Sequence, residues 1–169
     1  SPPGGDLSEP VSQATLRIVK VFWGLSASLA YKRHFPAIDW LTSYSLYADR
    51  LASWYTSNVA RDFNNYRAEA MRILQEEAQL DEIVRLVGMD ALSPRDRLTM
   101  ETAKAVREDY LHQNAFHEVD TYSSLEKQYR MLKLIIDCYR RSLSSLEGGA
   151  ELGKVLGISA REKIGRSKY

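Results

Sequence analysis

Residues 148–155 read GGAELGKV and almost match a phosphate-binding loop, whose pattern is G-x-x-x-x-G-K-[ST]. Gly148, Gly153 and Lys154 are in register, but Val155 stands where the pattern needs a hydroxyl group for magnesium. Such a loop also follows a buried strand and opens a helix. Here the glycines follow YRRSLSSLE, which is typical of the last turns of an amphipathic helix. We therefore predict that Gly148 and Gly149 end a helix and bind no phosphate.

The other residues with catalytic or metal-binding chemistry form no recognisable motif. His112 and His117 are five residues apart, which places them off a shared helix face. The stretch HEVDT is not H-E-x-x-H, because its fifth residue is Thr121. No G-x-S-x-G pattern occurs, and Cys138 fits the apolar pattern of a helix as a packed thiol. The sequence alone predicts neither a catalytic residue nor a metal ligand.

Composition limits the function classes further. The 169 residues carry 23 Lys and Arg against 22 Asp and Glu, and this balance gives no support for binding nucleic acid or a membrane surface through bulk charge. No apolar run approaches the roughly 20 residues of a membrane helix, and no signal peptide is visible. The single cysteine suits a reducing compartment. The opening SPPGGDLSEP suggests a fragment of a longer protein.

The elements that would position functional residues begin with a mixed N-terminal part. Ser8 and Pro10 favour a helix start, and the apolar spacing predicts one helix over residues 11–33. Pro36 disfavours helical geometry at Phe35, so we predict an extended segment there. DWLTSYS, residues 39–45, is predicted to be a turn at the main organisational boundary.

The rest of the chain has a helical pattern. Helices are predicted over about 46–62, 66–87 and 94–110, followed by a long last helix whose apolar residues are spaced by three or four from Leu125 to Leu146. The second helix is predicted to bury one stripe of apolar residues and to end at Gly88; the stripe comprises Ile73, Leu74, Ile83, Val84 and Val87.

Caps and charges complete this prediction. Ser93 is the expected N-cap of the third helix with Pro94 in its first turn, and Asp120 or Thr121 is the expected cap of the last. The tail, residues 152–169, carries five Lys or Arg against one Glu. A solvated face is the expected role of this tail, and a contact with a partner is the alternative.

Three stretches together resemble the catalytic A subunit of archaeal and vacuolar-type rotary ATPases. Residues 2–47, PPGGDLSEPVSQATLRIVKVFWGLSASLAYKRHFPAIDWLTSYSLY, resemble the end of its nucleotide-binding domain. Residues 88–122, GMDALSPRDRLTMETAKAVREDYLHQNAFHEVDTY, resemble its C-terminal helical domain, and the ending REKIGRSKY fits the same family. The resemblance implies a mainly α fold, in which residues 1–43 are a short α/β remnant of the nucleotide-binding domain and residues 44–169 a helical bundle.

The resemblance also implies a nucleotide site. In the family, aromatic residues in the HFPAI and QNAF segments flank adenine, and these match Phe35 and Phe116, with Tyr122 a further candidate. The phosphate-binding loop, the Mg²⁺ ligands and the general base of the family lie upstream of this chain. ATP or ADP with Mg²⁺ is therefore expected in the full subunit, with neither bound tightly by this fragment and no turnover from it. Ordinary core packing of both phenylalanines is the alternative.

A second region resembles the loop that faces the central rotor, with an ordinary helix connection as the alternative. The residues concerned are Met89, Asp90, Ser93, Pro94, Arg95 and Arg97. The two arginines do not suit a purely electrostatic push on a basic rotor, so we predict a loop that transmits motion through its shape and packing.

The family implies B subunits in an alternating A3B3 ring, a central stalk, and a cytoplasmic head peripheral to the membrane. Two alternatives stay open at the level of sequence: a non-catalytic helical interaction module and the related non-catalytic B subunit. The sequence does not distinguish ATP synthesis from hydrolysis, or proton from sodium coupling.

Overall fold

A computed structural model describes residues 6–169, so the first residues of the PPGGD stretch lie outside the described part. The fold is mainly helical with one two-stranded sheet. The N-terminal part contains α1 (Pro10–Ile18), β1 (Val21–Leu25), α2 (Ala27–Tyr31) and β2 (Ile38–Ser45). The remainder contains α3 (Ala48–Asn58), α4 (Phe63–Val87), η2 (Met89–Ala91), α5 (Pro94–Ala105), η3 (Val106–Leu111), α6 (Leu125–Glu147), α7 (Leu152–Leu156) and α8 (Ser159–Gly165).

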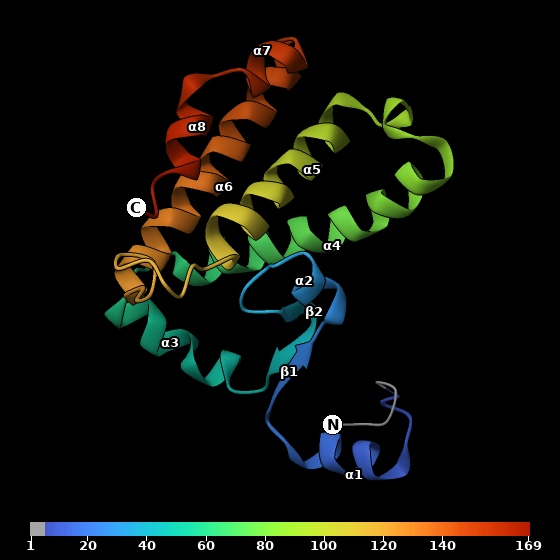
Figure 1. Ribbon diagram of the computed structural model, residues 1–169. Helices are drawn as coiled ribbons and strands as arrows, with labels where there is room; N and C mark the ends of the chain where they lie inside the picture. The colour runs from blue at the N-terminus through green and yellow to red at the C-terminus, as the bar shows by residue number, and fades with distance from the viewer. Residues whose placement is uncertain (1–5) are drawn as a thin grey trace.

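Three long helices form the centre of the molecule. Figure 1 shows α4, α5 and α6 packed together, with α7 and α8 alongside α6 and with α1 and the hairpin projecting to one side. Side chains from η3 and from all three helices make the core, and the largest fully buried ones are Tyr139, Ile73, Leu98, Leu132, Ile136 and Val106. Trp40 of β2 packs against this core, so the hairpin is joined to the bundle. The predicted fold class is confirmed.

The prediction of a single helix over residues 11–33 is wrong. Helix α1 ends at Ile18, and the chain continues as β1 and then as the short helix α2, which Ser26 caps by accepting a hydrogen bond from the Leu29 N–H. The stretch VKVFW is rich in β-branched and aromatic residues, which favour strands. Pairing with β2, which lies later in the chain, therefore outweighs the helical spacing of the apolar residues.

The predicted turn at residues 39–45 is also wrong, because these residues belong to β2. Strand β2 pairs antiparallel with β1, with Leu25 opposite Ile38 and Val21 opposite Ser45, and the register shifts between Phe22 and Gly24. The Asp39 carboxylate accepts the Leu41 N–H, a local bond typical of turns. Turn-forming residues are therefore present, but they sit at an irregularity within a paired strand. The HFPAI segment is a bent loop that leads into β2.

The predicted ends of the bundle helices are mostly confirmed. Ser93 caps α5 by accepting from the Asp96 N–H, and Gly88 ends α4 with a φ of 86°. Gly149, with a φ of 90°, follows the end of α6. The near-match to a phosphate-binding loop thus follows a helix and not a strand. The predicted cap at Asp120 or Thr121 is wrong, because Ser124 caps α6 while Asp120 lies buried in the preceding loop.

The apolar stripe predicted on α4 is buried over only part of its length. Ile73 and Leu74 lie in the core, whereas Ile83 and Val87 are exposed. Figure 1 shows why: α4 and α5 diverge toward the connection that joins them, so the last turns of α4 have no facing helix.

The two isoleucines of α4 give a matched test of this core. Ile73 is 0% exposed and Ile83 44% exposed. We expect Ile73→Ala to lower the free energy of unfolding by about 2–5 kcal/mol, because it leaves a cavity. We expect Ile83→Ala to change it by about 0.5 kcal/mol or less. Urea denaturation of both variants measures the difference, and equal losses would contradict the assigned core.

Candidate functional site

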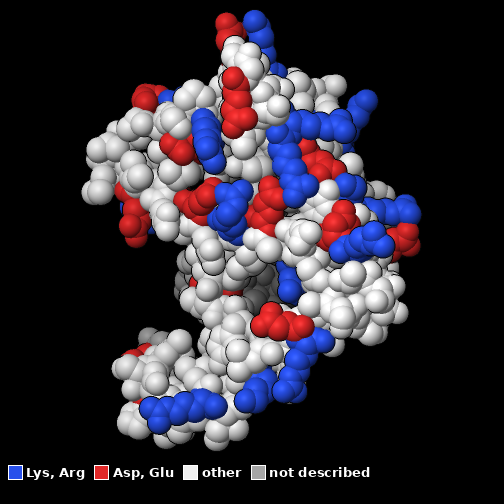
Figure 2. All heavy atoms as spheres, turned by 180° about the vertical axis from the view of Figure 1, so that it is seen from behind, with Lys and Arg blue, Asp and Glu red and all other residues white. Residues whose placement is uncertain are grey.

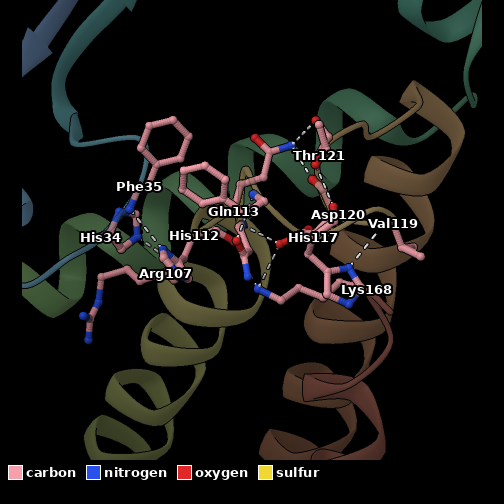
Figure 3. A network of polar contacts seen from close by, with 12 residues as sticks. His34, Phe35, Arg107, His112, Gln113, His117, Val119, Asp120, Thr121 and Lys168 are labelled. Atoms are coloured by element: carbon pink, nitrogen blue, oxygen red, sulfur yellow. Dashed lines mark hydrogen bonds and ion pairs between the residues drawn. The ribbon is translucent and has the colours of Figure 1, made fainter.

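Two loops that are far apart in sequence meet at the side of the bundle. One is residues 32–37, between α2 and β2, and carries Phe35; the other is residues 112–124, between η3 and α6, and carries Phe116 and Tyr122. The Gln113 N–H donates to the Phe35 carbonyl at 2.7 Å, and the Phe35 N–H donates to His112 Nδ1 at 3.0 Å. Both backbone polar groups of Phe35 are therefore bonded to the second loop (Figure 3). We call these contacts the junction.

His34 adds a third link to the junction. Its Nε2 lies 3.0 Å from the Arg107 carbonyl and its Nδ1 lies 3.2 Å from the Pro36 carbonyl. A neutral imidazole donates to only one of these oxygens, whereas a protonated imidazole donates to both. The His34 ring also packs against His112, with ring centroids 5.2 Å apart.

Beneath the junction, Arg107 is held by a buried partner. Its guanidinium donates from Nε and Nη2 to the Glu77 carboxylate of α4, at 3.0 and 2.8 Å. Burial raises the pKa of Glu77, and the hydrogen bonds and charge of Arg107 oppose that rise. The two-pronged contact fixes η3 against α4 and so fixes the carbonyl that faces His34.

The second loop is also fastened internally. The Asn114 N–H donates to Asp120 Oδ2 at 2.6 Å, and the Gln113 side chain donates to the Asp120 carbonyl at 2.7 Å. Thr121 Oγ1 donates to the His117 carbonyl at 2.7 Å. Backbone groups of this loop are thus paired within it, which holds its shape without regular secondary structure.

The predicted site residues are all on the surface of these loops. Phe35 is 53% exposed, Tyr122 is 85% exposed and Phe116 is 98% exposed. The alternative of core packing is therefore wrong for Phe116 in this structure. The junction brings the loops of Phe35 and Phe116 together, and Tyr122 lies further along the second loop. Exposed aromatic faces on fixed loops suit a flat ligand or a protein partner.

The second predicted region, residues 88–97, lies at the opposite end of α5 from the junction (Figure 1). Arg97 Nη2 is 2.8 Å from Asp90 Oδ1, and Ser93 Oγ donates to Asp96 Oδ2 at 2.7 Å. The charge of Arg97 is thus paired inside the loop, whereas Arg95 is exposed. Next to them, the apolar side chains Leu86, Val87 and Met89 are also exposed.

Sequence reasoning missed the residues that fasten the junction, namely His34, Glu77, Arg107, Asp120 and Lys168. The tail, residues 152–169, was expected to be solvated, but Lys168 is 5% exposed and lies 3.7 Å from the equally buried Asp120. Its position among four other basic residues gives no sign of burial. His34, Glu77 and Arg107 were equally hard to identify, because the His34–Arg107 and Arg107–Glu77 contacts join residues 73 and 30 positions apart.

The part of the chain that the structure describes contains neither a metal-binding cluster nor a membrane-spanning helix. Among residues 6–169, no group of three or more His, Cys, Asp or Glu is arranged to hold a metal ion. The same residues include no helix that is long and apolar enough to cross a membrane. Figure 2 shows acidic and basic side chains interspersed over one face, without a large area of one sign.

Comparison with known proteins gives the family. The family model described as the C-terminal domain of V and A type ATP synthase matches residues 52–156. The chain belongs to this family. A second model, the nucleotide-binding domain of the ATP synthase alpha/beta family, matches residues 1–45. The predicted resemblance is thus confirmed.

Similar chains agree with this assignment. The chain is 67% identical over all 169 residues to a V-type ATP synthase alpha chain of Acetivibrio thermocellus and 63% identical to that of Clostridium botulinum, and it spans 29% and 28% of their lengths. It therefore corresponds to less than a third of either relative. Among solved structures, the ATP synthase subunit NeqB from Nanoarcheaum equitans aligns with a TM-score of 0.67 over 81% of this chain and 34% of its own, at 24% identity. That likeness supports the fold.

The junction is expected to weaken in acid through His112. Burial, and then the charges of Lys168 and His34, lower the pKa of His112 below its ordinary value of 6.5, and Asp120 opposes them. The unfolded state then binds protons more readily, so this stabilisation is complete above about pH 6.5 and is lost as the pH falls through the folded-state pKa. Protonation of Nδ1 also removes the acceptor of the Phe35 N–H.

An NMR titration of the His112 imidazole, combined with hydrogen exchange of the Phe35 amide, measures this effect. We expect a midpoint below 6.5 and a lower protection factor of the Phe35 amide, relative to its intrinsic exchange rate at the same pH, on protonation. His112→Asn, which does not titrate, should remove the pH dependence of that protection factor. A midpoint at or above the ordinary histidine value would contradict the prediction.

Proposed function

We propose that this chain is the C-terminal part of the catalytic subunit of a rotary V/A-type ATP synthase and supplies the adenine side of its nucleotide pocket. The observation that carries the proposal is the junction, in which the Gln113 N–H donates to the Phe35 carbonyl at 2.7 Å. This bond places the loops of two exposed phenylalanines side by side. The family membership of the chain and the alpha-chain relatives support the same function.

Adenine binding follows from the chemistry of the exposed rings. A purine has a flat π-face, and aromatic side chains bind it by stacking without requiring matched hydrogen bonds. Phe116 is 98% exposed, so nearly all of its ring is free to be covered by a base. Tyr122 is the further candidate on the same loop. The fastening of that loop reduces the conformational freedom lost on binding.

The same chemistry limits what the 169 residues do alone. Two stacking contacts contribute roughly 2–6 kcal/mol, and association costs at least about 4 kcal/mol. We therefore expect weak ATP binding by this chain alone. Phosphoryl transfer needs Mg²⁺ and positioned charges, which we assign to residues upstream of this chain, so we expect no hydrolysis above background from the isolated chain.

We place the domain boundary at residues 43 and 44, as the sequence predicts. The two family models support a division in this region, because one ends at residue 45 and the other begins at residue 52. Strand β2 continues to Ser45, and α3 begins at Ala48.

We further propose that residues 88–97 face a central rotor within an assembly of alternating A and B subunits. The contact set is Met89, Asp90, Ser93, Pro94, Arg95 and Arg97. The exposed apolar side chains at the end of α4 support a contact made through shape and packing. Such an assembly would be the cytoplasmic head of a complex peripheral to the membrane. The compared relatives are alpha chains, which favours the A subunit over the related B subunit.

The stacking role predicts a selective loss of ATP affinity. In the assembled enzyme, we expect Phe35→Ala and Phe116→Ala each to raise the KM for ATP by about 5- to 150-fold, since one base–aromatic stack contributes about 1–3 kcal/mol. The kcat should change much less, because the groups that act on the phosphates are untouched. Steady-state ATPase kinetics measure both constants. Tyr47→Ala, at an exposed tyrosine outside the junction, is the control, and unchanged KM values in both Phe variants would refute the adenine role.

The rotor contact predicts a loss of coupling. We expect Leu86→Asp with Val87→Asp to lower ATP-driven ion transport per ATP hydrolysed, because charges replace exposed apolar side chains at the end of α4, directly beside the proposed contact set. Arg95→Glu should have a smaller effect if shape and packing dominate. Transport and hydrolysis are measured together in reconstituted vesicles, with Leu134→Asp on α6 as an exposed control. Unchanged coupling in the double variant would argue against a rotor contact.

A further inference from the structure

We propose that Lys168 is a positioning residue for nucleotide binding, which it serves by holding the loop that presents Phe116. This inference rests on the proposed adenine site. Lys168 contacts no ligand in this role; it acts through residues 112–121 of the loop. The contacts that carry the inference lie on both sides of Phe116 in sequence (Figure 3).

The burial of Lys168 is the first observation. Its side chain is 6% exposed, although lysine is among the residue types that are rarely buried without a partner. The ammonium donates to the His112 carbonyl at 3.2 Å and lies 3.7 Å from Asp120 Oδ2. A buried charge is costly unless it is paired and hydrogen-bonded, and Lys168 has both kinds of partner. Its position is therefore specific.

Asp120 connects Lys168 to the shape of the loop. The same oxygen that faces Lys168 accepts the Asn114 N–H at 2.6 Å, while the Asp120 carbonyl accepts the Gln113 side chain. The carboxylate is 7% exposed, so without Lys168 it would be a buried negative charge supported by a single backbone donor. Lys168 thus stabilises the residue around which the loop folds.

Tyr169 adds a second contact with the same loop. Its ring packs against His117, with centroids 4.6 Å apart. Lys168 therefore holds the loop at His112, four residues before Phe116, and at Asp120, four residues after it, while Tyr169 packs beside the residue that follows Phe116. The base of the loop is fixed and its aromatic residue is left exposed.

This arrangement predicts an effect on affinity and not on chemistry. If the loop relaxes, Phe116 must be ordered again when a base binds, and the cost appears as weaker binding. The groups that we assign to phosphate chemistry are not in this chain, and kcat should be preserved.

The experiment compares Lys168→Met, Lys168→Arg and Lys163→Met in the assembled enzyme. Lys163 is an exposed lysine of α8 in the same basic tail, so it controls for loss of charge alone. We expect Lys168→Met to raise the KM for ATP about tenfold, equivalent to about 1.4 kcal/mol, with a nearly unchanged kcat. Lys168→Arg should restore part of the affinity, and Lys163→Met should resemble the unmodified enzyme. An unchanged KM in Lys168→Met would overturn the inference.

A double-mutant cycle with Phe116→Ala separates this inference from the adenine site itself. If Lys168 acts through Phe116, adding Lys168→Met to Phe116→Ala should raise the KM no further. Independent, additive effects would overturn the role of Lys168 and leave the adenine site intact. If Phe116→Ala alone leaves the KM unchanged, the inference fails, because Lys168 then has no contact with the base to act through; the adenine site itself fails only if Phe35→Ala also leaves the KM unchanged.

Folding is checked by a second variant. Lys168→Met alone leaves the Asp120 carboxylate buried without its partner and could prevent folding. The double variant Lys168→Met with Asp120→Asn removes both buried charges and so avoids this problem. We expect faster hydrogen exchange at the Asn114 and Gln113 amides in this variant, with the exchange of the α4–α6 core unchanged. The KM should again rise more than kcat changes. Wild-type exchange in the loop, or faster exchange throughout the bundle, would overturn a positioning role.

Discussion

The pairing of Phe35 with residues 112 and 113 is the constraint on which the candidate site depends. A two-stranded hairpin has little stability of its own, so β1 and β2 need support from the bundle. Trp40 gives that support by packing against the core, and the bonds from Gln113 and to His112 fix the chain at Phe35. These bonds involve the backbone of Phe35. They therefore fix the position of this residue whichever side chain it carries. The sequence between α2 and β2 is therefore held in place by a loop almost eighty residues away.

The sequence predicted the bundle far better than the hairpin, for a physical reason. The ends of α4 and α5 follow from residues close by, since Gly88 adopts positive φ and Ser93 accepts a bond from the residue three positions on. By contrast, β1 and β2 exist because they pair with each other, and neither is recognisable by its own spacing. The prediction of one helix over residues 11–33 is wrong because the VKVFW stretch leads into a strand that pairs with β2. The prediction of a buried α4 stripe is wrong at Ile83, because the exposure of Ile83 depends on how far α5 diverges from α4.

For the candidate site, the sequence could name the aromatic residues but not their support. Phe35 and Phe116 came from resemblance to a family, and the structure adds that their loops are joined and that Phe116 is almost wholly exposed. Lys168 could not be found in the same way. Its burial depends on Asp120, 48 positions earlier, and a run of basic residues looks the same whether its lysines face solvent or a carboxylate. The number of charged residues in a segment does not show which of them are paired and buried, because the fold decides which charged side chains meet.

The two candidate regions also share one rigid connection. Helix α5 and the π-helix η3 form a continuous segment from Pro94 to Leu111, with residues 88–97 at its start and the second loop directly after its end. The His112 N–H donates to the Arg107 carbonyl, five residues back, at 2.8 Å, and the same carbonyl faces His34. Arg107 is in turn fixed to Glu77 of α4. A displacement of the second loop on nucleotide binding would therefore act on the end of a helix whose other end carries the proposed rotor contact. Because packed helices move as units, this geometry would carry a change at the proposed adenine site to the proposed rotor contact through α5 and η3.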